Sequence, residues 1–300
     1  SAHLALRALV TLQPTPCGPA PAPHTLLTRA ARLLSLHVSS RATEFPQELF
    51  IKTRDGSEFV DCDIKQYIYR IVYLSGEYEP STTAAFQAIL RPGDVVFDIG
   101  ANYGYFTMLA SRLVGGSGRV IAFEPQKEVV NSLNRNIAHN RARNITVVDC
   151  ALGASPRIAT LFQPPAVDSG HASLHGGKDC SAIGLCEVRT LDTTMHLHEY
   201  PLPALVKIDV EGSEVSVLKG AQATLASRPI LVIEANPPAL ERAGTSISEM
   251  ASLLCEAGYD YFLELQGYKV SRISKPCKAR GNLLCANLNA HSRRLGESLK

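Results

Sequence analysis

From residue 93 onward, short apolar runs alternate with longer stretches that carry apolar residues on one side only. Those stretches space their apolar residues three or four positions apart, as at Phe106, Leu109 and Leu113, which indicates amphipathic helices. Runs that are apolar throughout indicate a parallel sheet buried on both faces. The alternation predicts a doubly wound α/β domain with a mostly parallel sheet over residues 93–290. The runs lie at 95–97, 120–123, 145–148, 204–208 and 230–233, and further strands are expected at 259–263 and 283–288.

Three segments of this domain are predicted in more detail. Residues 151–200 carry many Pro, Gly and His residues, and we expect them to be irregular. Residues 215–225 are predicted to form one helix. Ser246 and Glu249 have the spacing of a capping box, which predicts that another helix begins there.

The segment before the domain has a pattern of its own. Residues 49–62 read as two short strands around Asp55-Gly56, a dipeptide typical of tight hairpin turns. Two short helices are expected over 64–74 and 81–90. We therefore predict that residues 46–92 form a hairpin and helices that act as a lid on the domain.

Both ends of the chain are expected to lie outside these units. The first 43 residues contain no Asp or Glu but four Arg, and a Pro/Ala run follows Pro14. This composition is typical of an organellar targeting segment, and a disordered extension over residues 1–45 is the alternative. Residues 291–300 are predicted to be a tail. No run reaches the eighteen apolar residues of a transmembrane helix.

Charge and cysteine spacing exclude some functions. A net charge of +2 without a basic cluster argues against a nucleic-acid partner, so we expect a small molecule or a glycan. None of the eight cysteines forms C-x-x-C, which argues against a zinc ribbon. Two close pairs can form disulfides in an oxidising compartment, and two other cysteines are expected to be buried thiols. The pairs are Cys180 with Cys186 and Cys277 with Cys285, and the thiols are Cys150 and Cys255.

The turn after the first core strand is the first candidate site. It reads DIGANYG over residues 98–104, and its glycines let the backbone approach a ligand that the next helix faces with its N–H groups. A dinucleotide-binding turn has the pattern G-x-G-x-x-G, which is absent here. The acid at Asp98 disfavours a pyrophosphate and suits a cationic ligand with an amino group, such as the methionine end of S-adenosylmethionine.

Glu124 ends the second core strand, where a carboxylate can accept hydrogen bonds from both hydroxyls of a ribose. Together with the glycine turn, it predicts a nucleoside site at this edge of the sheet. The alternative is that Asp98 only caps the following helix and that Glu124 is a solvated turn residue.

Four segments of the chain resemble the successive motifs of the FkbM-type methyltransferase family, over roughly residues 50–265. They are VVFDIGANYGYFT, IAFEP, LVKIDVEGSEVSVLKG and ILVIEANP, and GEYEP before the first core strand is also similar to the family. The resemblance implies a class I methyltransferase (Rossmann-like) fold and S-adenosylmethionine as the methyl donor. It also implies O-methylation of a sugar or small-metabolite hydroxyl. The cofactor contacts that it implies are Asp98, Gly100, Asn102, Gly104, Glu124 on the ribose, Cys150 and Ala151 near the adenine, and Glu79 closing over the cofactor.

Three acids near two strand ends are the candidate catalytic residues. Asp209 and Glu211 alternate along a backbone that we expect to be extended, so they point the same way, and Glu234 ends the neighbouring strand. They can share a metal, or they can divide the roles of general base and orienting group. Without a metal their repulsion raises one pKa, which favours a base, and we assign no metal. The alternative is that Glu211 caps the next helix and that Lys207 pairs with an acid.

His171 lies in the irregular segment and resembles a family position near the active site, which makes it a possible second base. A solvated loop histidine is the alternative. Two other functions stay open for the whole chain: a nicotinamide-dependent oxidoreductase and a non-catalytic binding module that keeps the fold. The sequence identifies no acceptor.

Overall fold

A computed structural model of the chain describes residues 49–164, 171–177 and 179–296. The extension predicted for residues 1–45 lies outside the described residues. Within these ranges, no helix combines the length and the apolar character that crossing a membrane requires.

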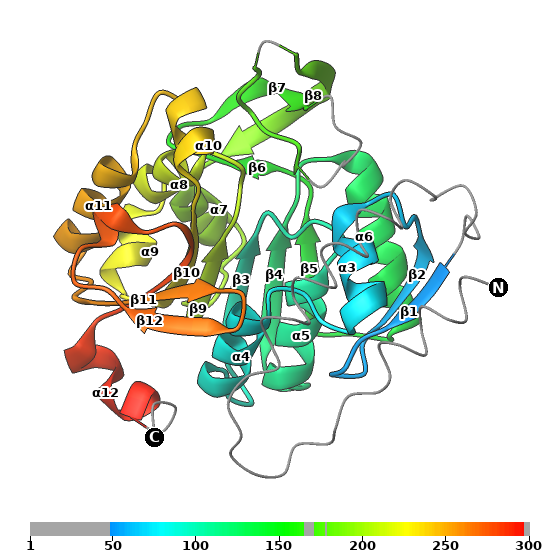
Figure 1. The fold of residues 1–300 in the computed structure, drawn as a ribbon, viewed down its shortest axis with the longest axis horizontal. Helices are drawn as coiled ribbons and strands as arrows, with labels where there is room; N and C mark the ends of the chain where they lie inside the picture. Colours follow the sequence, from blue (N-terminus) through cyan, green and yellow to red (C-terminus); the bar gives the residue numbers. More distant parts are fainter. Residues whose placement is uncertain (1–48, 165–170, 178, 297–300) are drawn as a thin grey trace.

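An eight-stranded sheet forms the centre of the described residues, in the order β12-β11-β13-β10-β9-β3-β4-β5 (Figure 1). The five strands from β10 to β5 are parallel, and β13 lies antiparallel between β10 and β11. This is the mostly parallel α/β sheet that the apolar runs predict. The strands are β3 (Val95–Ile99), β4 (Arg119–Phe123), β5 (Ile145–Val148), β9 (Leu205–Ile208), β10 (Ile230–Ala235), β11 (Tyr261–Gln266), β12 (Lys269–Arg272) and β13 (Gly281–Ala286).

Helices cover both faces of this sheet because successive strand residues point to opposite sides. Val96 belongs to the core that α4, α5 and α6 cover, whereas Phe97 belongs to the core under α7, α8, α9 and α11. The helices are α3 (Tyr67–Ser75), α4 (Pro80–Ile89), α5 (Tyr105–Val114), α6 (Lys127–His139), α7 (Leu191–Leu197), α8 (Glu214–Lys219), α9 (Gln222–Ala226), α10 (Pro237–Arg242), α11 (Ile247–Glu256) and α12 (Leu288–Gly296), with a 3-10 turn at Pro276–Lys278.

The strand order reverses beside β3, and this reversal places the site. The chain runs outward from β3 to β4 and β5, and then returns to β9 on the other side of β3. Ligands of such sheets bind outside the carboxyl ends of the strands at this reversal. The crevice is therefore expected beyond the ends of β3, β4 and β9.

The N-terminal hairpin forms as predicted, from β1 (Leu49–Lys52) and β2 (Glu58–Cys62). It lies beside α6 (Figure 1), where the side chains of Asn136 and Asn140 accept hydrogen bonds from the backbone N–H groups of Val60 and Glu58. The side-chain amides of Asn136 and Asn140 thus accept hydrogen bonds from backbone N–H groups on the open edge of the hairpin.

The prediction that 151–200 is irregular is wrong. A three-stranded sheet forms there, from β6 (Ala151–Leu152), β7 (Arg157–Gln163) and β8 (Ser181–Arg189), and α7 follows it. It lies beyond the carboxyl ends of the central strands in Figure 1. The first five residues of β8 are exposed, so this strand lacks the apolar alternation by which a half-buried strand is recognised.

The single helix predicted for 215–225 is interrupted, giving α8 and α9. At Gly220, a Cβ atom would lie 2.0 Å from the carbonyl oxygen of Gly153, so the backbones meet there and only glycine fits. Helix α11 begins as predicted, because the Ser246 side chain accepts a hydrogen bond from the N–H of Glu249. Within the predicted tail, residues 291–296 form the end of α12.

The seven described cysteines are all free thiols, so neither disulfide alternative forms among them. Cys150 is buried as predicted, but Cys255 is exposed because it lies on the outer side of α11, away from Met250 and Leu254.

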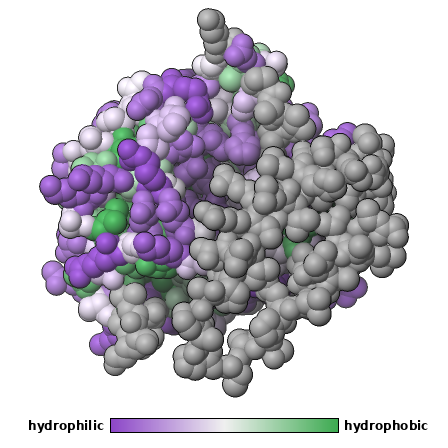
Figure 2. Space-filling view, viewed as in Figure 1, coloured by the Kyte–Doolittle hydropathy of each residue, from purple (hydrophilic) through white to green (hydrophobic). Residues whose placement is uncertain are grey.

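On the face in Figure 2, hydrophilic side chains separate the visible apolar ones wherever the surface is not grey.

Candidate active site

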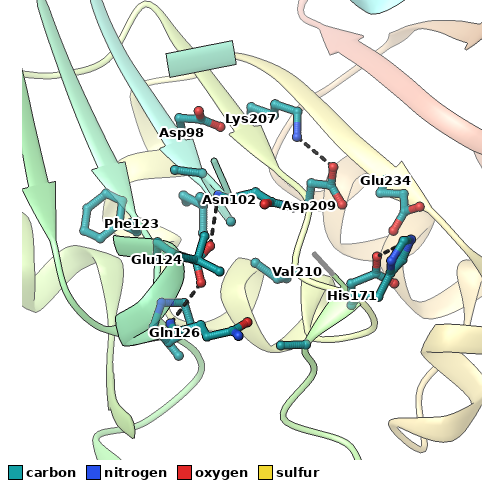
Figure 3. A pocket seen from close by; sticks show the side chains of 18 of the residues that line it. Asp98, Asn102, Phe123, Glu124, Gln126, His171, Lys207, Asp209, Val210 and Glu234 are labelled. Carbon is teal, nitrogen blue, oxygen red and sulfur yellow. Dashed lines mark hydrogen bonds and ion pairs between the residues drawn. The ribbon is translucent and has the colours of Figure 1, made fainter. Parts of the chain in front are cut away.

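A pocket lies at the carboxyl ends of β3, β4, β9 and β10, where the reversal of strand order predicts it. Its empty volume is about 1180 Å³, including space that is open to solvent. Figure 3 shows Glu124 and Gln126 on one side and Asp209, Glu234 and His171 on the other. The candidate residues that line it are Glu79, Asp98, Gly100, Asn102, Glu124, Cys150, Ala151, His171, Asp209, Glu211 and Glu234.

Gly104 is the one candidate residue outside this lining. A Cβ atom there would lie 2.4 Å from the Leu133 side chain, and the residue has a φ of +93° as it begins α5. Its requirement for glycine therefore comes from the packing of α5 against α6. The family motif alone does not separate a packing glycine from one that faces a ligand.

Asp98 presents a buried acceptor to the pocket. The residue is 1% exposed, and its Oδ2 atom accepts a hydrogen bond from Thr107 Oγ1 at 2.6 Å. Among the described residues, its Oδ1 atom has no hydrogen-bond partner. Burial raises the pKa of Asp98, against the opposing charge of Lys207. A buried carboxylate oxygen without a partner is costly, so a cationic group bound here would be stabilised.

Gly100 brings the turn against the end of β9. It has a φ of +82°, and a Cβ atom there would lie 1.8 Å from the carbonyl oxygen of Asp209. No other residue type fits this contact without moving one of the two segments. The turn and the carboxylate-bearing end of β9 are thus held side by side.

Glu124 is anchored and is not a solvated turn residue. Its Oε2 atom accepts a hydrogen bond from the N–H of Asn102, and its Oε1 atom accepts one from the N–H of Gln126, both at 2.9 Å. Burial raises the pKa of Glu124 to about 7. Each carboxylate oxygen keeps a second lone pair, so the group can still accept two hydroxyl groups.

Replacing Glu124 by alanine is expected to weaken S-adenosylmethionine binding about tenfold to a hundredfold, because hydrogen bonds to a charged group are worth about 1.5–3 kcal/mol. Isothermal titration calorimetry measures the affinity. The control is Glu128→Ala on the exposed side of α6, which should bind as the parent does. Equal affinities of the two variants would place the ribose elsewhere.

Asp209, Glu211 and Glu234 each bring one carboxylate oxygen to within 4.8 Å of the others. The predicted extended backbone is wrong at Glu211, which has a φ of +53°. The tight turn after β9 directs this side chain back toward β10, whose Ile233 pairs with Ile208. The acids therefore converge because β9 and β10 are neighbours.

Burial and the charge of Asp209 raise the pKa of Glu211 to about 8 and that of Glu234 to about 10. The Oε2 atom of Glu234 is buried without a hydrogen-bond partner in the part of the chain that the structure describes. Of the two, Glu234 has its pKa raised further. Retained protons or a bound divalent cation would each relieve the repulsion within this group.

Lys207 pairs with Asp209, its Nζ atom lying 2.7 Å from Oδ2. The lysine is 3% exposed, and its ammonium lies 4.9 Å from the ring centroid of Phe106. Burial lowers the pKa of Lys207, but the carboxylates of Asp209 and Asp98 raise it above its ordinary value overall. A lysine inside an apolar strand is the sequence signal for this buried pair.

His171 faces the carboxylate group. Its Nε2 atom lies 3.8 Å from Glu211 Oε1, and its side chain is 46% exposed. The structure thus brings the predicted second base to Glu211. The capping alternative for Glu211 does not hold, because Glu214 Oε1 accepts the N–H groups of Val210 and Gly212 in that turn.

The family model for the methyltransferase FkbM domain matches residues 98–261. The chain belongs to the FkbM methyltransferase family. It is 30% identical over 193 residues to the hexuronic acid methyltransferase AglP of Haloferax volcanii, covering 63% of this chain and 72% of that protein. It is also 30% identical over 185 residues to the 31-O-demethyl-FK506 methyltransferase FkbM of Streptomyces tacrolimicus, covering 52% and 68%.

Solved structures similar to this FkbM-family chain include an S-adenosylmethionine-dependent O-methyltransferase from Thermotoga maritima. The match has 13% identity and a TM-score of 0.41, and it covers 83% of this chain and 80% of the other. The family and the α/β sheet identify the FkbM-family protein as a class I methyltransferase that uses S-adenosylmethionine. The nicotinamide and non-catalytic alternatives are set aside on this ground.

Proposed function

We propose that this FkbM-family enzyme transfers a methyl group to a hydroxyl of an uncharged sugar or small metabolite. The observation that carries the proposal is the convergence of Asp209, Glu211 and Glu234 in one pocket with the Asp98 turn and Glu124. A hydroxyl is a weak nucleophile until its proton is being removed, and a nearby carboxylate can remove it. The names of the two relatives, a hexuronic acid methyltransferase and a 31-O-demethyl-FK506 methyltransferase, agree with a sugar or small metabolite as the acceptor, whereas the absence of charge on it rests on the charges of the pocket.

The cofactor half of the pocket fits S-adenosylmethionine. Asp98 offers a buried, unpartnered oxygen to a cation, and Gly100 allows the backbone to approach closely. Glu124 would hold the ribose, and Cys150 and Ala151, which line the same pocket, would contact the adenine. When bound, the cofactor supplies an electrophilic methyl group on a positively charged sulfur. Asn102 would help by fixing Glu124 through its backbone N–H.

We assign the role of general base to Glu211. Asp209 is engaged by Lys207, and the pKa of Glu234 is raised further than that of Glu211, so each is less suited to the role of base. A pKa of about 8 is well matched to a base that works near neutral pH. The acceptor oxygen bonds to the methyl carbon as the carbon–sulfur bond breaks, and its proton passes to Glu211. Glu234 would donate a hydrogen bond that orients the acceptor.

Methylation of a carboxylate is the second candidate, because a hexuronic acid carries both hydroxyl and carboxyl groups. A carboxylate acceptor has no proton to lose and needs no base, so Glu211 would have no role in its methylation. The burial and the negative charges that raise the pKa values of Glu211 and Glu234 also disfavour an additional negative charge. Lys207, the lysine in the lining, is already paired with Asp209. These charges favour the uncharged acceptor.

The test is a transfer assay with methyl-labelled S-adenosylmethionine and two matched sets of acceptors, neutral methyl glycosides and the corresponding uronates. We expect label to enter the neutral compounds as a base-stable ether. Mild alkaline hydrolysis distinguishes an ether from a methyl ester. Label that enters only uronates, or that is lost on mild hydrolysis, would overturn the proposal.

A further inference from the structure

Glu79 reaches the pocket from an uncommon backbone conformation. It lies just before α4 with a φ of +43°, in the left-handed region that residues other than glycine seldom adopt. Such a conformation costs about 1–3 kcal/mol and persists only where the surroundings hold it. The N–H of Ser81 donates to the carbonyl of Gly267, so the β11–β12 hairpin fixes the start of α4. The conformation of Glu79 therefore depends on contacts from the C-terminal part of the chain.

The most direct of these contacts comes from Asn282. Its Nδ2 atom donates to Glu79 Oε2 at 2.6 Å and to Thr82 Oγ1 at 3.0 Å. Asn282 is 7% exposed and lies on β13, where it pairs with Glu234 of β10. Its amide uses both N–H groups on the first turn of α4. Aspartate has the same shape without these donors, and alanine has neither.

The contact sets both the direction and the charge of Glu79. Burial and the charge of Asp209 raise the pKa of Glu79 to about 7, while Lys207 and the hydrogen bonds of Thr82 and Asn282 act to lower it. The hydrogen bond therefore favours the ionised carboxylate at a position that lines the pocket. Asp98 lines the same pocket with its unpartnered oxygen, so two carboxyl groups are available to a cationic ligand.

We infer that Asn282 is a positioning residue for cofactor binding, which holds the Glu79 carboxylate toward the cationic part of S-adenosylmethionine. The inference rests on the proposed contact of Glu79 with the cofactor. Both residues lie outside the segment 98–261 that the family model matches. The cofactor site of this chain thus depends on a hydrogen bond between its N-terminal unit and its last sheet strand.

The test measures S-adenosylmethionine affinity by calorimetry, without any acceptor, for Asn282→Ala, Glu79→Gln and the double variant. Each single variant is expected to bind about tenfold to a hundredfold more weakly, the effect of losing a hydrogen bond to a charged group. The double variant should bind no more weakly than Glu79→Gln, because Asn282 acts only through that carboxylate. Losses that multiply in the double variant would overturn the inference.

The matched control is Asn287→Ala, just beyond the other end of β13. Asn287 is also 7% exposed, and its Nδ2 atom donates to the carbonyl of Gly258, away from the pocket. It should lower the melting temperature and leave cofactor affinity unchanged. A loss of cofactor affinity in this variant would show a general effect of β13 and contradict a specific role for Asn282.

Asn282→Asp keeps the shape of the residue and serves if the alanine variant does not fold. It is expected to bind S-adenosylmethionine more weakly, because it replaces two donors with acceptors. Affinity equal to that of the parent in either folded variant would overturn the inference and leave the hydroxyl-transfer proposal standing. If no neutral compound accepts the methyl group while the variants show the expected changes in cofactor affinity, only the proposal of an uncharged acceptor is overturned.

Discussion

Replacing Glu211 by glutamine is expected to lower kcat about 10²–10⁴-fold, the range that a positioned general base contributes. Glutamine keeps the size of the side chain but does not accept a proton at these pH values. Cofactor affinity should change little, because Glu211 lies near His171 and the acids at the ends of β9 and β10, and Figure 3 shows His171 across the pocket from Glu124. Steady-state kinetics on a neutral acceptor and calorimetry with S-adenosylmethionine measure the two effects separately.

The pH dependence gives this variant a second readout. The base works without its proton, and the pKa of Glu211 is raised to about 8, so kcat/KM should fall as the pH drops below about 8. The midpoint for kcat should lie lower, since a bound cation favours the ionised form. The Glu211→Gln variant should lose this dependence. A parent midpoint between 4 and 5 would contradict the assignment.

The control for Glu211 is Glu249→Gln, which removes an exposed ion pair with Lys219 on the surface of α11. Exposed pairs contribute about 0–1 kcal/mol to stability, and this one is remote from the pocket lining. Its kcat should equal that of the parent. A kcat within a factor of about two for Glu211→Gln would assign the proton transfer to another residue.

Replacing Gly100 by alanine is expected to abolish cofactor binding and to destabilise the fold by about 2–5 kcal/mol. The added Cβ would lie 1.8 Å from the carbonyl oxygen of Asp209, so the turn and the end of β9 must separate. Overpacking of this kind costs about 1–3 kcal/mol, and the φ of +82° adds about 1–2 kcal/mol for a residue with a side chain. Thermal unfolding and calorimetry measure the two losses.

Two other glycines separate the causes of this effect. Gly115 has a φ of +64° with no atom near its Cβ position, so Gly115→Ala should show the backbone cost alone. Gly116 has no neighbour within 4 Å, and its φ lies outside the positive range, so Gly116→Ala should be within about 0.5 kcal/mol of the parent. Cofactor binding should survive in both. Normal binding by Gly100→Ala would contradict the close approach of the two segments.

Much of the cofactor half of the pocket follows from local sequence. The apolar runs at 95–97 and 120–123 predict adjacent parallel strands, and the residues that follow a parallel strand must lie at one edge of its sheet. Asp98, Gly100 and Glu124 are therefore placed together by their positions in the chain. Their roles toward the cofactor stay predictions, which the variants above test.

The acceptor half of the pocket depends on contacts that no local sequence pattern indicates. Glu211 joins Glu234 through a left-handed turn, although alternation along an extended strand was expected. The sheet over 151–200 escaped prediction because β8 is largely exposed and lacks apolar alternation. His171 reaches Glu211 from this same region. The sheet and the turn that the sequence did not predict thus both lie on the acceptor side of the pocket.

By itself, the sequence determined the parallel sheet, its carboxyl edge and the acids at that edge, because periodicity and strand ends are local properties of the chain. Only the tertiary structure decided which acids are buried with raised pKa values, which one pairs with Lys207, and that Asn282 donates a hydrogen bond to Glu79. The physical reason is that burial and charge–charge distances change a pKa, and both arise from residues far apart in the chain. Glu79 and Asn282 are 203 positions apart, and no periodic pattern in the sequence indicates their hydrogen bond.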